Sequence, residues 1–284
     1  MNKMRWILLV LCLAIYCPAG LAQSSVEGKI LDSNTGKGIA FVNVGIAAKG
    51  IGTVSDEKGW YRLQILDKKD EVTFSSIGYS TKALSAANLL KEGEIRLDPK
   101  VYEIEELELS SRKFGPEIIL GKKFEKRYHS VGFGSQQLGT EVAAYIEIEK
   151  ETLLKSAHFI LNHGNGDSVL FRVNIFDFKD GRIRENLVPE NVIIATAQKK
   201  GTLSVDLSAY NIITDNDVLL CLEWIKDDNG KGNEGITFGS KKTRSGKKFY
   251  IRQASQGYFQ PFSQAIPYAP KLELGFYMIA KQVE

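Results

Sequence analysis

Short apolar runs separated by polar turns dominate the chain from residue 24 onward. In residues 41–46, every second side chain is aliphatic, and in a strand such residues share one face. Turn-forming residues recur between the runs, as in residues 32–36 and 56–59. This pattern predicts short β-strands at the spacing typical of a β-sandwich, with one short helix near residues 85–91.

The same pattern continues through the second half of the chain. Hairpin turns are indicated at residues 163–167 and at Asp180-Gly181. The nine strands expected here are residues 141–148, 156–162, 168–176, 191–196, 201–206, 218–225, 235–240, 249–253 and 272–280. Because no long helix interrupts them, they predict a second β-sandwich of jelly-roll type.

A change of composition separates the two predicted sandwiches. Residues 101–109 alternate apolar and acidic side chains and predict one strand, and residues 110–127 are polar and basic and contain Gly115-Pro116. We therefore expect an all-β protein with two β-sandwich domains in tandem. Its parts are a first domain at residues 23–99, a linker with one acidic strand at 100–123, and a second domain at 124–284.

The first 22 residues have the pattern of a secretory signal peptide. Lys3 and Arg5 precede an apolar run, and small residues at positions 20 and 22 fit cleavage before Gln23. The alternative, an N-terminal membrane anchor, needs a longer apolar run to cross a bilayer with ease. We expect an exported protein, periplasmic, outer-membrane-associated or at the cell surface, with no transmembrane segment in the mature chain.

Six motifs between Ser25 and Pro99, about a quarter of the chain, resemble the carboxypeptidase regulatory-like domain. They are Gly28-Lys29-Ile30-Leu31-Asp32, Thr35-Gly36, Val42-Asn43-Val44, Gly52-Thr53-Val54-Ser55-Asp56, Gly59-Trp60-Tyr61 and Ser76-Ile77-Gly78-Tyr79. The resemblance implies a transthyretin-like, immunoglobulin-like sandwich of about seven strands, often found ahead of other envelope modules. The chain departs from the family's usual residues at Gly38, Ala40 and Ala48. These positions lie in loops and at a sheet edge, so the differences concern the binding surface.

Charge and cysteine content narrow the classes of partner only slightly. The whole chain carries a net charge of +3, and no basic stripe indicates nucleic acid. Cys221 is the one cysteine after the predicted signal peptide, so no internal disulfide is expected. It lies in an apolar run and is predicted to be a small buried core residue.

The sequence contains no constellation that supports catalysis. Its histidines, His129, His158 and His163, lack a Glu at the spacing of a zinc carboxypeptidase. No Gly-x-Ser-x-Gly elbow and no phosphate-binding loop occurs. Acidic residues that could pair as in a glycosidase lie in turn-like segments, namely Asp215, Asp217, Asp227 and Asp228. We expect a protein without enzymatic activity, cofactor or metal.

One loop keeps calcium binding open as an alternative. Asp227, Asp228, Asn233 and Glu234 offer oxygen ligands within a few residues of one another. Their spacing is not that of an EF-hand, and the same residue types are usual at a hairpin tip.

Aromatic residues crowd the last quarter of the chain, at Tyr250 in the predicted strand 249–253 and in a proline-containing loop at residues 256–270. Tyr258, Phe259, Phe262 and Tyr268 could form a rigid platform for a sugar ring or a protein partner. The alternative is that the loop buries these rings over one end of the sandwich, as large loops commonly do.

These features favour a non-enzymatic exported binding or assembly module of a bacterial cell envelope. Its expected partner is an envelope protein or a glycan. A carbohydrate-binding protein that uses the aromatic loop is the first alternative. A hydrolase is the second, and it requires clustered carboxylates in a cleft.

Overall fold

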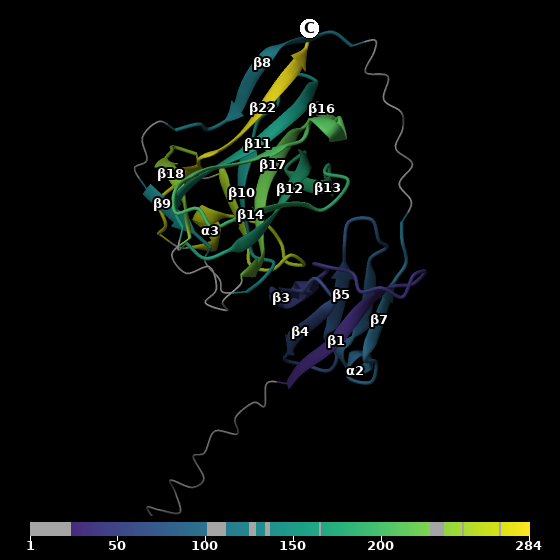
Figure 1. Cartoon of the computed structure of the whole chain (residues 1–284). Coiled ribbons are helices and arrows are strands. Elements are labelled where there is room, and N and C mark those ends of the chain that lie inside the picture. The colour runs from purple at the N-terminus through teal and green to yellow at the C-terminus, as the bar shows by residue number, and fades with distance from the viewer. Residues whose placement is uncertain are drawn as a thin grey trace, which may run out of the picture.

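The computed structural model describes residues 24–100, 112–124, 129–133, 137–164, 166–227, 236–245, 247–266 and 268–284 (Figure 1). The predicted signal peptide and the predicted acidic strand lie outside these residues. The possible calcium loop also lies outside them, except for the backbone of Asp227. Within the described part of the chain, no helix has the length and apolarity needed to cross a bilayer.

The first domain is a β-sandwich of two small sheets. One sheet has the strand order β4–β1–β7, and the other has the order β3–β2–β5–β6. The strands are β1 (Ser24–Asp32), β2 (Asn43–Ile46), β3 (Ile51–Val54), β4 (Trp60–Ile65), β5 (Glu71–Ser75), β6 (Lys82–Ser85) and β7 (Glu94–Leu97). A 3₁₀ turn, η1 (Ala47–Lys49), and the short helix α2 (Ala86–Leu89) complete it, the latter within the predicted range.

The core of this sandwich is formed by side chains that alternate along the strands with exposed ones, as the sequence predicts. In β4 the side chains of Tyr61, Leu63 and Ile65 are buried and those between them are exposed. The turn before β4 is fixed by Asp56, whose carboxylate accepts hydrogen bonds from the backbone N–H groups of Lys58 and Trp60 at 2.8 Å each. Both sheets contribute to one hydrophobic core.

The second domain is a larger sandwich of two antiparallel sheets. Its seven-stranded sheet has the order β13–β12–β17–β10–β19–β20, with β14 also paired to β12. These strands are β10 (Glu141–Ile146), β12 (Val169–Lys179), β13 (Arg182–Asn186), β14 (Val192–Thr196), β17 (Asp217–Asp227), β19 (Phe249–Arg252) and β20 (Gln260–Pro261).

The facing sheet of this domain has eight strands. Its order is β21–β18–β11–β22–β8, with β15 and β16 paired to β11 and β9 paired to β18. The strands are β8 (Phe114–Gly121), β9 (His129–Gly132), β11 (Thr152–His163), β15 (Gly201–Asp206), β16 (Ile213–Thr214), β18 (Thr237–Lys242), β21 (Leu272–Leu274) and β22 (Phe276–Val283). A 3₁₀ turn, η3 (Ser208–Tyr210), and the short helix α3 (Phe262–Ala265) lie outside the sheets. One core, with Phe159, Phe171, Phe238 and Phe276 fully buried, fills the space between the sheets.

Two sequence-based expectations need correction. The second sandwich starts at Phe114 and not at residue 124, because β8 pairs with β22 within the predicted linker. Residues 256–270, expected to be a long loop without a strand, contain β20 and α3. The two-sandwich, all-β architecture itself is as predicted.

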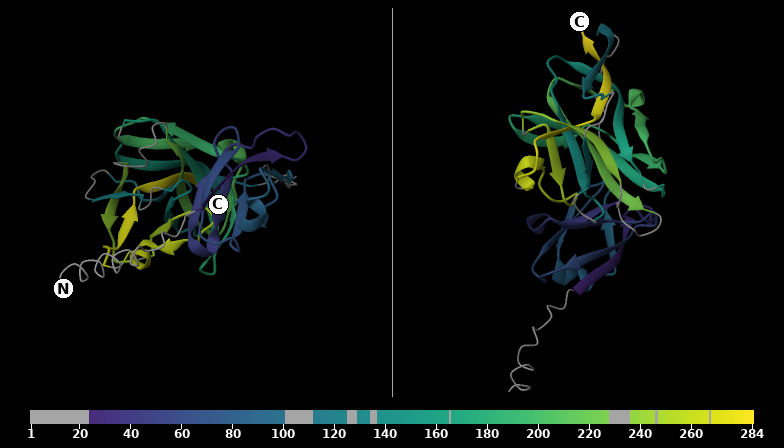
Figure 2. Two further views of the ribbon diagram at one scale, coloured as in Figure 1. Left: turned by 90° about the horizontal axis from the view of Figure 1, so that it is seen from below. Right: turned by 90° about the vertical axis from the view of Figure 1, so that its left-hand side faces the viewer.

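The two domains pack against each other end to end (Figures 1 and 2). An apolar contact joins Phe41 and Val54 of the first domain to Ile225 of the second. Around it, Gln137 accepts a hydrogen bond from the Gly52 N–H at 3.1 Å, and Gln256 donates one to the Ser75 hydroxyl at 2.7 Å. The junction is therefore a packed interface with directional polar contacts.

Candidate functional site: the outer face of the seven-stranded sheet

The seven-stranded sheet turns one face toward the core and the other face, here the outer face, away from it. Successive side chains of a strand point to opposite sides, so the residues that alternate with the core positions lie on the outer face. In β10, Val142, Ala144 and Ile146 belong to the core, and Ala143 and Tyr145 belong to a separate cluster on the outer face. This face carries three features in succession: a row of charges, a small apolar cluster and an aromatic pocket.

The charge row consists of Arg172, Glu223, Glu141 and Arg252, which lie in register on β12, β17, β10 and β19. The two glutamates are direct cross-strand partners, an arrangement that like charges disfavour. Each glutamate has an arginine on its other side: Arg172 Nη1 lies 3.3 Å from Glu223 Oε2, and Arg252 pairs with Glu141 Oε1. Asn174 also donates to Glu223 at 3.0 Å.

The charge row is buried where the two domains meet. Arg172 is 2% exposed, and both glutamates are 0% exposed. Arg172 also donates to the backbone carbonyl of Phe41 and to Asn43 Oδ1 of the first domain. Burial is the largest influence on Glu141 and raises its pKa to about 7, although the Arg252 charge acts in the opposite direction.

The aromatic pocket lies further along the outer face. It is defined here by Tyr145, Phe178, Tyr250, Tyr258 and Phe259, which line a cavity of about 780 Å³. The first three rings come from β10, β12 and β19, so the sheet holds them in place. Tyr258 is 77% exposed and its ring is available to a ligand.

Polar groups surround the rings of the aromatic pocket. The Tyr145 hydroxyl donates to the Asp217 carboxylate, and the Lys248 ammonium lies 4.7 Å from the centre of the Tyr145 ring. Burial, followed by the Asp217 hydrogen bond, raises the pKa of Tyr145 above its usual value. The pocket therefore offers flat apolar surfaces flanked by hydrogen-bonding groups, which is the usual composition of a small-molecule site.

The aromatic residues predicted from the sequence do not act as one platform. Tyr258 and Phe259 line the aromatic pocket. Phe262 instead stacks on Phe249 with ring centres 4.4 Å apart and packs against the main core. Tyr268 is fully exposed and does not line the pocket. Tyr250, also noted among the aromatic residues of the last quarter, lines the pocket as well. Tyr145 and Phe178 were not predicted, because strand alternation alone does not show that they meet the other rings.

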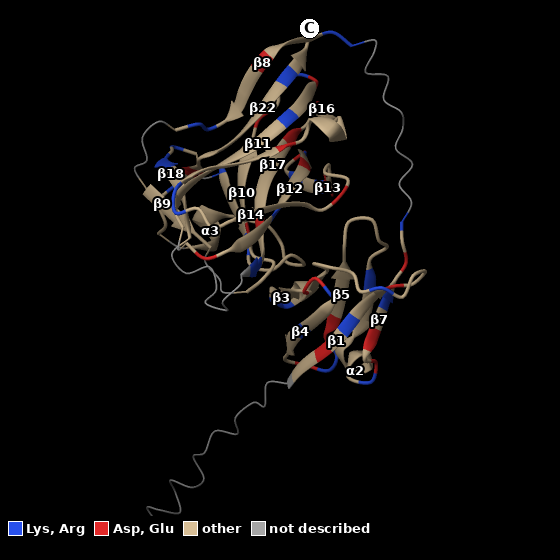
Figure 3. Ribbon diagram, viewed as in Figure 1, with Lys and Arg blue, Asp and Glu red and all other residues tan. Residues whose placement is uncertain are grey.

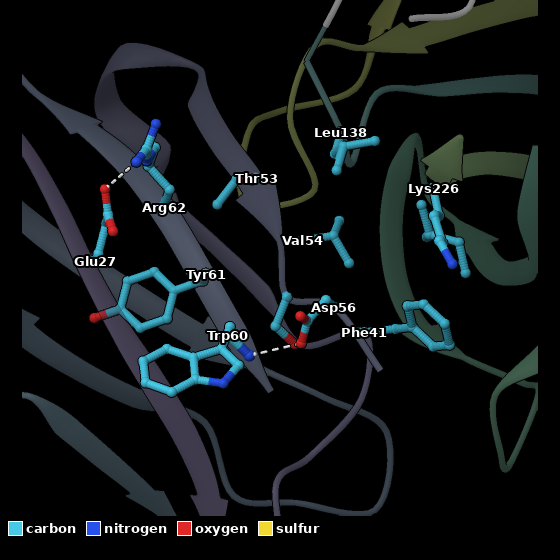
Figure 4. A pocket seen from close by; sticks show the side chains of 12 residues that line it. Glu27, Phe41, Thr53, Val54, Asp56, Trp60, Tyr61, Arg62, Leu138 and Lys226 are labelled. Atoms are coloured by element: carbon cyan, nitrogen blue, oxygen red, sulfur yellow. Dashed lines mark hydrogen bonds and ion pairs between the residues drawn. The ribbon is translucent and has the colours of Figure 1, made fainter. Parts of the chain in front are cut away.

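Two cavities lie at the domain junction. One, of about 530 Å³, is the junction cleft, defined here by Ser76, Tyr79, Arg172, Arg252, Ser255 and Gln256 among its lining residues. The other, of about 450 Å³, lies beside the apolar domain contact and is lined by Phe41 and Val54 of the first domain and by Leu138 and Lys226 of the second (Figure 4). Its wall continues to Trp60 and to the Arg62–Glu27 ion pair of the first domain.

The other candidate residues considered in the sequence take part in packing and hydrogen bonding within the fold. Cys221 is fully buried, as predicted, and burial raises the pKa of its thiol well above the usual value. His158 stacks on Tyr277, with ring centres 4.6 Å apart, and hydrogen-bonds to Ser156 and Ser204. Asp217 is not a simple turn residue, since it also accepts the Ile148 N–H at 2.9 Å. Within the described part of the chain, no three His, Cys, Asp or Glu residues lie together as metal ligands would.

The fold and the outer face define a two-domain all-β protein with a small sandwich attached to a larger one. Residues 26–108 match the model of the CarboxypepD_reg-like domain. The first sandwich is therefore a carboxypeptidase regulatory-like domain, as its motifs predict. No curated protein matches the chain.

Three solved structures are similar to the chain at low identity. The cysteine protease and lectin-like domains of Cwp84, a surface layer associated protein of Clostridium difficile, are 11% identical, with a TM-score of 0.39 over 82% of this chain and 46% of that one. Clostridial Cwp84 after propeptide cleavage is 12% identical, with a TM-score of 0.37 over 82% and 51%. A structure of infectious bursal disease virus is 10% identical, with a TM-score of 0.26 over 92% and 61%. The chain thus spans about half the length of the Cwp84 structures.

Proposed function

We propose that this protein is a non-enzymatic, exported binding module of a bacterial cell envelope, and that its second sandwich binds a glycan in the aromatic pocket. The observation that carries the proposal is the convergence of five aromatic rings on one cavity of about 780 Å³. Aromatic faces beside polar groups suit a sugar ring, whose C–H face stacks and whose hydroxyls bond to neighbours. The N-terminal pattern supports export, and the carboxypeptidase regulatory-like domain is a frequent partner of envelope modules.

The buried glutamate pair does not favour a hydrolase. Glu141 and Glu223 are cross-strand partners, and the pKa of Glu141 is raised as in a general acid. However, Glu141 and Glu223 are both 0% exposed, and neither lines any of the cavities described above. A glycosidase needs both carboxyl groups in contact with its substrate. Here Arg172 and Arg252 contact the two carboxylates instead, which indicates that the glutamates have a structural role.

A glycan array probed with the chain from Gln23 onward tests the proposal. We expect specific binding of a restricted set of glycans. The Tyr258→Ala variant should bind them at least about twofold more weakly, because an aromatic contact contributes ~0.5–1.5 kcal/mol beyond its buried area. Tyr268→Ala is the matched control, since Tyr268 is also exposed but does not line the pocket.

Three outcomes count against the proposal. The first is an array without any specific ligand, and the second is equal binding by wild type and Tyr258→Ala. The third is release of shortened glycans during incubation, which would indicate catalysis. An array repeated with Ca²⁺ shows whether binding also involves the loop between Asp227 and Glu234.

A further inference from the structure

The junction cleft has a lining that is distinct from that of the aromatic pocket. The stack formed by Phe176, Phe259 and Arg252 separates the two, with the guanidinium carbon of Arg252 lying 4.4 Å from the centre of the Phe259 ring. Serine, threonine, asparagine, glutamine and tyrosine side chains from both domains make up most of the cleft wall. Its charged lining residues are Lys100, Arg172 and Arg252, and no carboxylate lines it in the described part of the chain.

Several buried polar groups of the cleft have no partner. The Ser76 and Ser255 hydroxyls, one from each domain, are inaccessible to solvent and make no hydrogen bond. The Nε–H groups of Arg172 and Arg252 are also without an acceptor. The Glu223 Oε1 and Glu141 Oε2 atoms of their ion-pair partners lack a donor too, but neither glutamate lines the cleft. Ser255 is 6% exposed and Arg172 is 2% exposed. Buried polar groups are normally satisfied, so such groups around one cavity indicate that a ligand or water supplies the missing acceptors.

We propose that the junction cleft is a binding site for a small oxyanion, a carboxylate or a phosphate group, held between the two domains. All four unpartnered groups can donate a hydrogen bond, and the two Nε–H groups can only donate. Donors and cations without a lining carboxylate select an acceptor-rich, negatively charged ligand. The cavity of about 530 Å³ leaves room for a sugar acid or a phosphorylated sugar around the anionic group.

The charge row supports this assignment. Arg172 and Arg252 are held in place by Glu223 and Glu141, which lie behind them and do not line the cleft. Each guanidinium is therefore oriented before a ligand arrives, and less conformational entropy is lost on binding. The ligand would contact both domains and stabilise their junction.

Calorimetric titration of the chain from Gln23 onward with sodium phosphate and with sodium glucuronate, at constant ionic strength, tests the site. We expect saturable binding of at least one anion and an increase in the thermal unfolding temperature with the same ligand. Saturation by phosphate alone assigns a phosphate ligand, and saturation by glucuronate alone assigns a sugar carboxylate. No saturable binding of either anion overturns the proposal.

Serine variants locate the site. Ser76→Ala and Ser255→Ala should each weaken anion binding by roughly tenfold or more, because a hydrogen bond to a charged group contributes ~1.5–3 kcal/mol. Ser25→Ala is the matched control, since Ser25 is exposed on β1 and lines none of the cavities described above. Ser76 is only half buried, so its variant stays informative if the Ser255 variant does not fold. Unchanged affinity in a folded Ser76→Ala variant overturns the assignment, whether or not glycans bind to the aromatic pocket.

Discussion

At the scale of single residues, the charge row connects the sheet to the domain junction. Arg172 has three acceptors: Glu223 on the neighbouring strand, and Asn43 and the Phe41 carbonyl in the first domain. Phe41 has a positive φ of 55°, a left-handed conformation that is uncommon for a residue with a side chain. The Arg172 hydrogen bond and the burial of the Phe41 ring hold this conformation in place.

Arg172→Met is expected to destabilise the protein by about 3–5 kcal/mol, because it leaves Glu223 buried without its ion-pair partner. The double variant Arg172→Met/Glu223→Leu should be more stable than this single variant, since no unpaired charge remains. Urea unfolding of the wild type and the two variants measures both effects. A double variant that is no more stable than the single one would show that the pair is not the source of the loss.

Glu141 makes a testable contribution to the pH dependence of stability. Its pKa rises from an ordinary value of 4.5 to about 7 in the folded chain, chiefly through burial. A proton therefore binds more tightly to the folded state and stabilises it. This stabilisation is fully present below about pH 4.5 and is lost as the pH rises through about 7. Glu141→Gln removes the contribution.

Relative to Glu141→Gln, the wild type should become less stable between about pH 5 and about pH 8. Urea unfolding of both proteins across this range provides the comparison, and charges that the two share cancel in the difference. If the free energies of unfolding of the two proteins differed by the same amount at every pH, Glu141 would have the same pKa in the folded and unfolded states.

At the scale of elements, strand alternation predicts most of the fold but not its edges. Eight of the nine strands expected in the second half of the chain are present as single strands. β8 was missed because Gly115-Pro116 and its polar surroundings are typical of a linker. It lies at the edge of the eight-stranded sheet, where a proline is tolerated because one side of the strand needs no partner. The predicted strand at 272–280 is two strands, β21 and β22, that pair with β18 and β11.

β3 shows how closely the first domain approaches the second. A Cβ on Gly52 would lie 2.7 Å from the Ala254 Cβ and 3.1 Å from the Val44 carbonyl oxygen. Gly52→Ala should therefore destabilise the junction by about 1–3 kcal/mol, as overpacking does. Gly93→Ala is the matched control in the same domain, because a Cβ there meets no atom within 4 Å.

Calorimetric unfolding distinguishes these two glycine variants. We expect Gly52→Ala to unfold at a lower temperature than the wild type, and Gly93→Ala to unfold close to it. Equal midpoints for all three proteins would show that β3 does not pack against the second domain as described.

At the scale of the whole molecule, the site depends on contacts that no local pattern reveals. The motifs of the first domain identify its fold, and the family match confirms it. Three of the five rings of the aromatic pocket, Tyr250, Tyr258 and Phe259, were among the aromatic residues noted in the sequence. The other two, Tyr145 and Phe178, come from strands that are distant in sequence, and only the sheet order places them beside the first three. The charge row was not predicted for the same reason.

Net charge is equally uninformative about the site. Lys and Arg are interspersed with Asp and Glu over both domains in the view of Figure 3. The features that distinguish the outer face are local: a buried row of two Arg–Glu pairs, a cluster of aromatic rings, and a cleft that no carboxylate of the described residues lines. Net charge and composition are summed over the whole chain, so they do not reveal these local features.

Hydrogen exchange with and without an array-selected glycan tests most directly whether the aromatic pocket is the binding site. The account predicts slower exchange on binding in β10, in β19 and around Tyr258, and unchanged exchange around Tyr268. Protection confined to the first domain, protection around Tyr268 or no protection at all would contradict it.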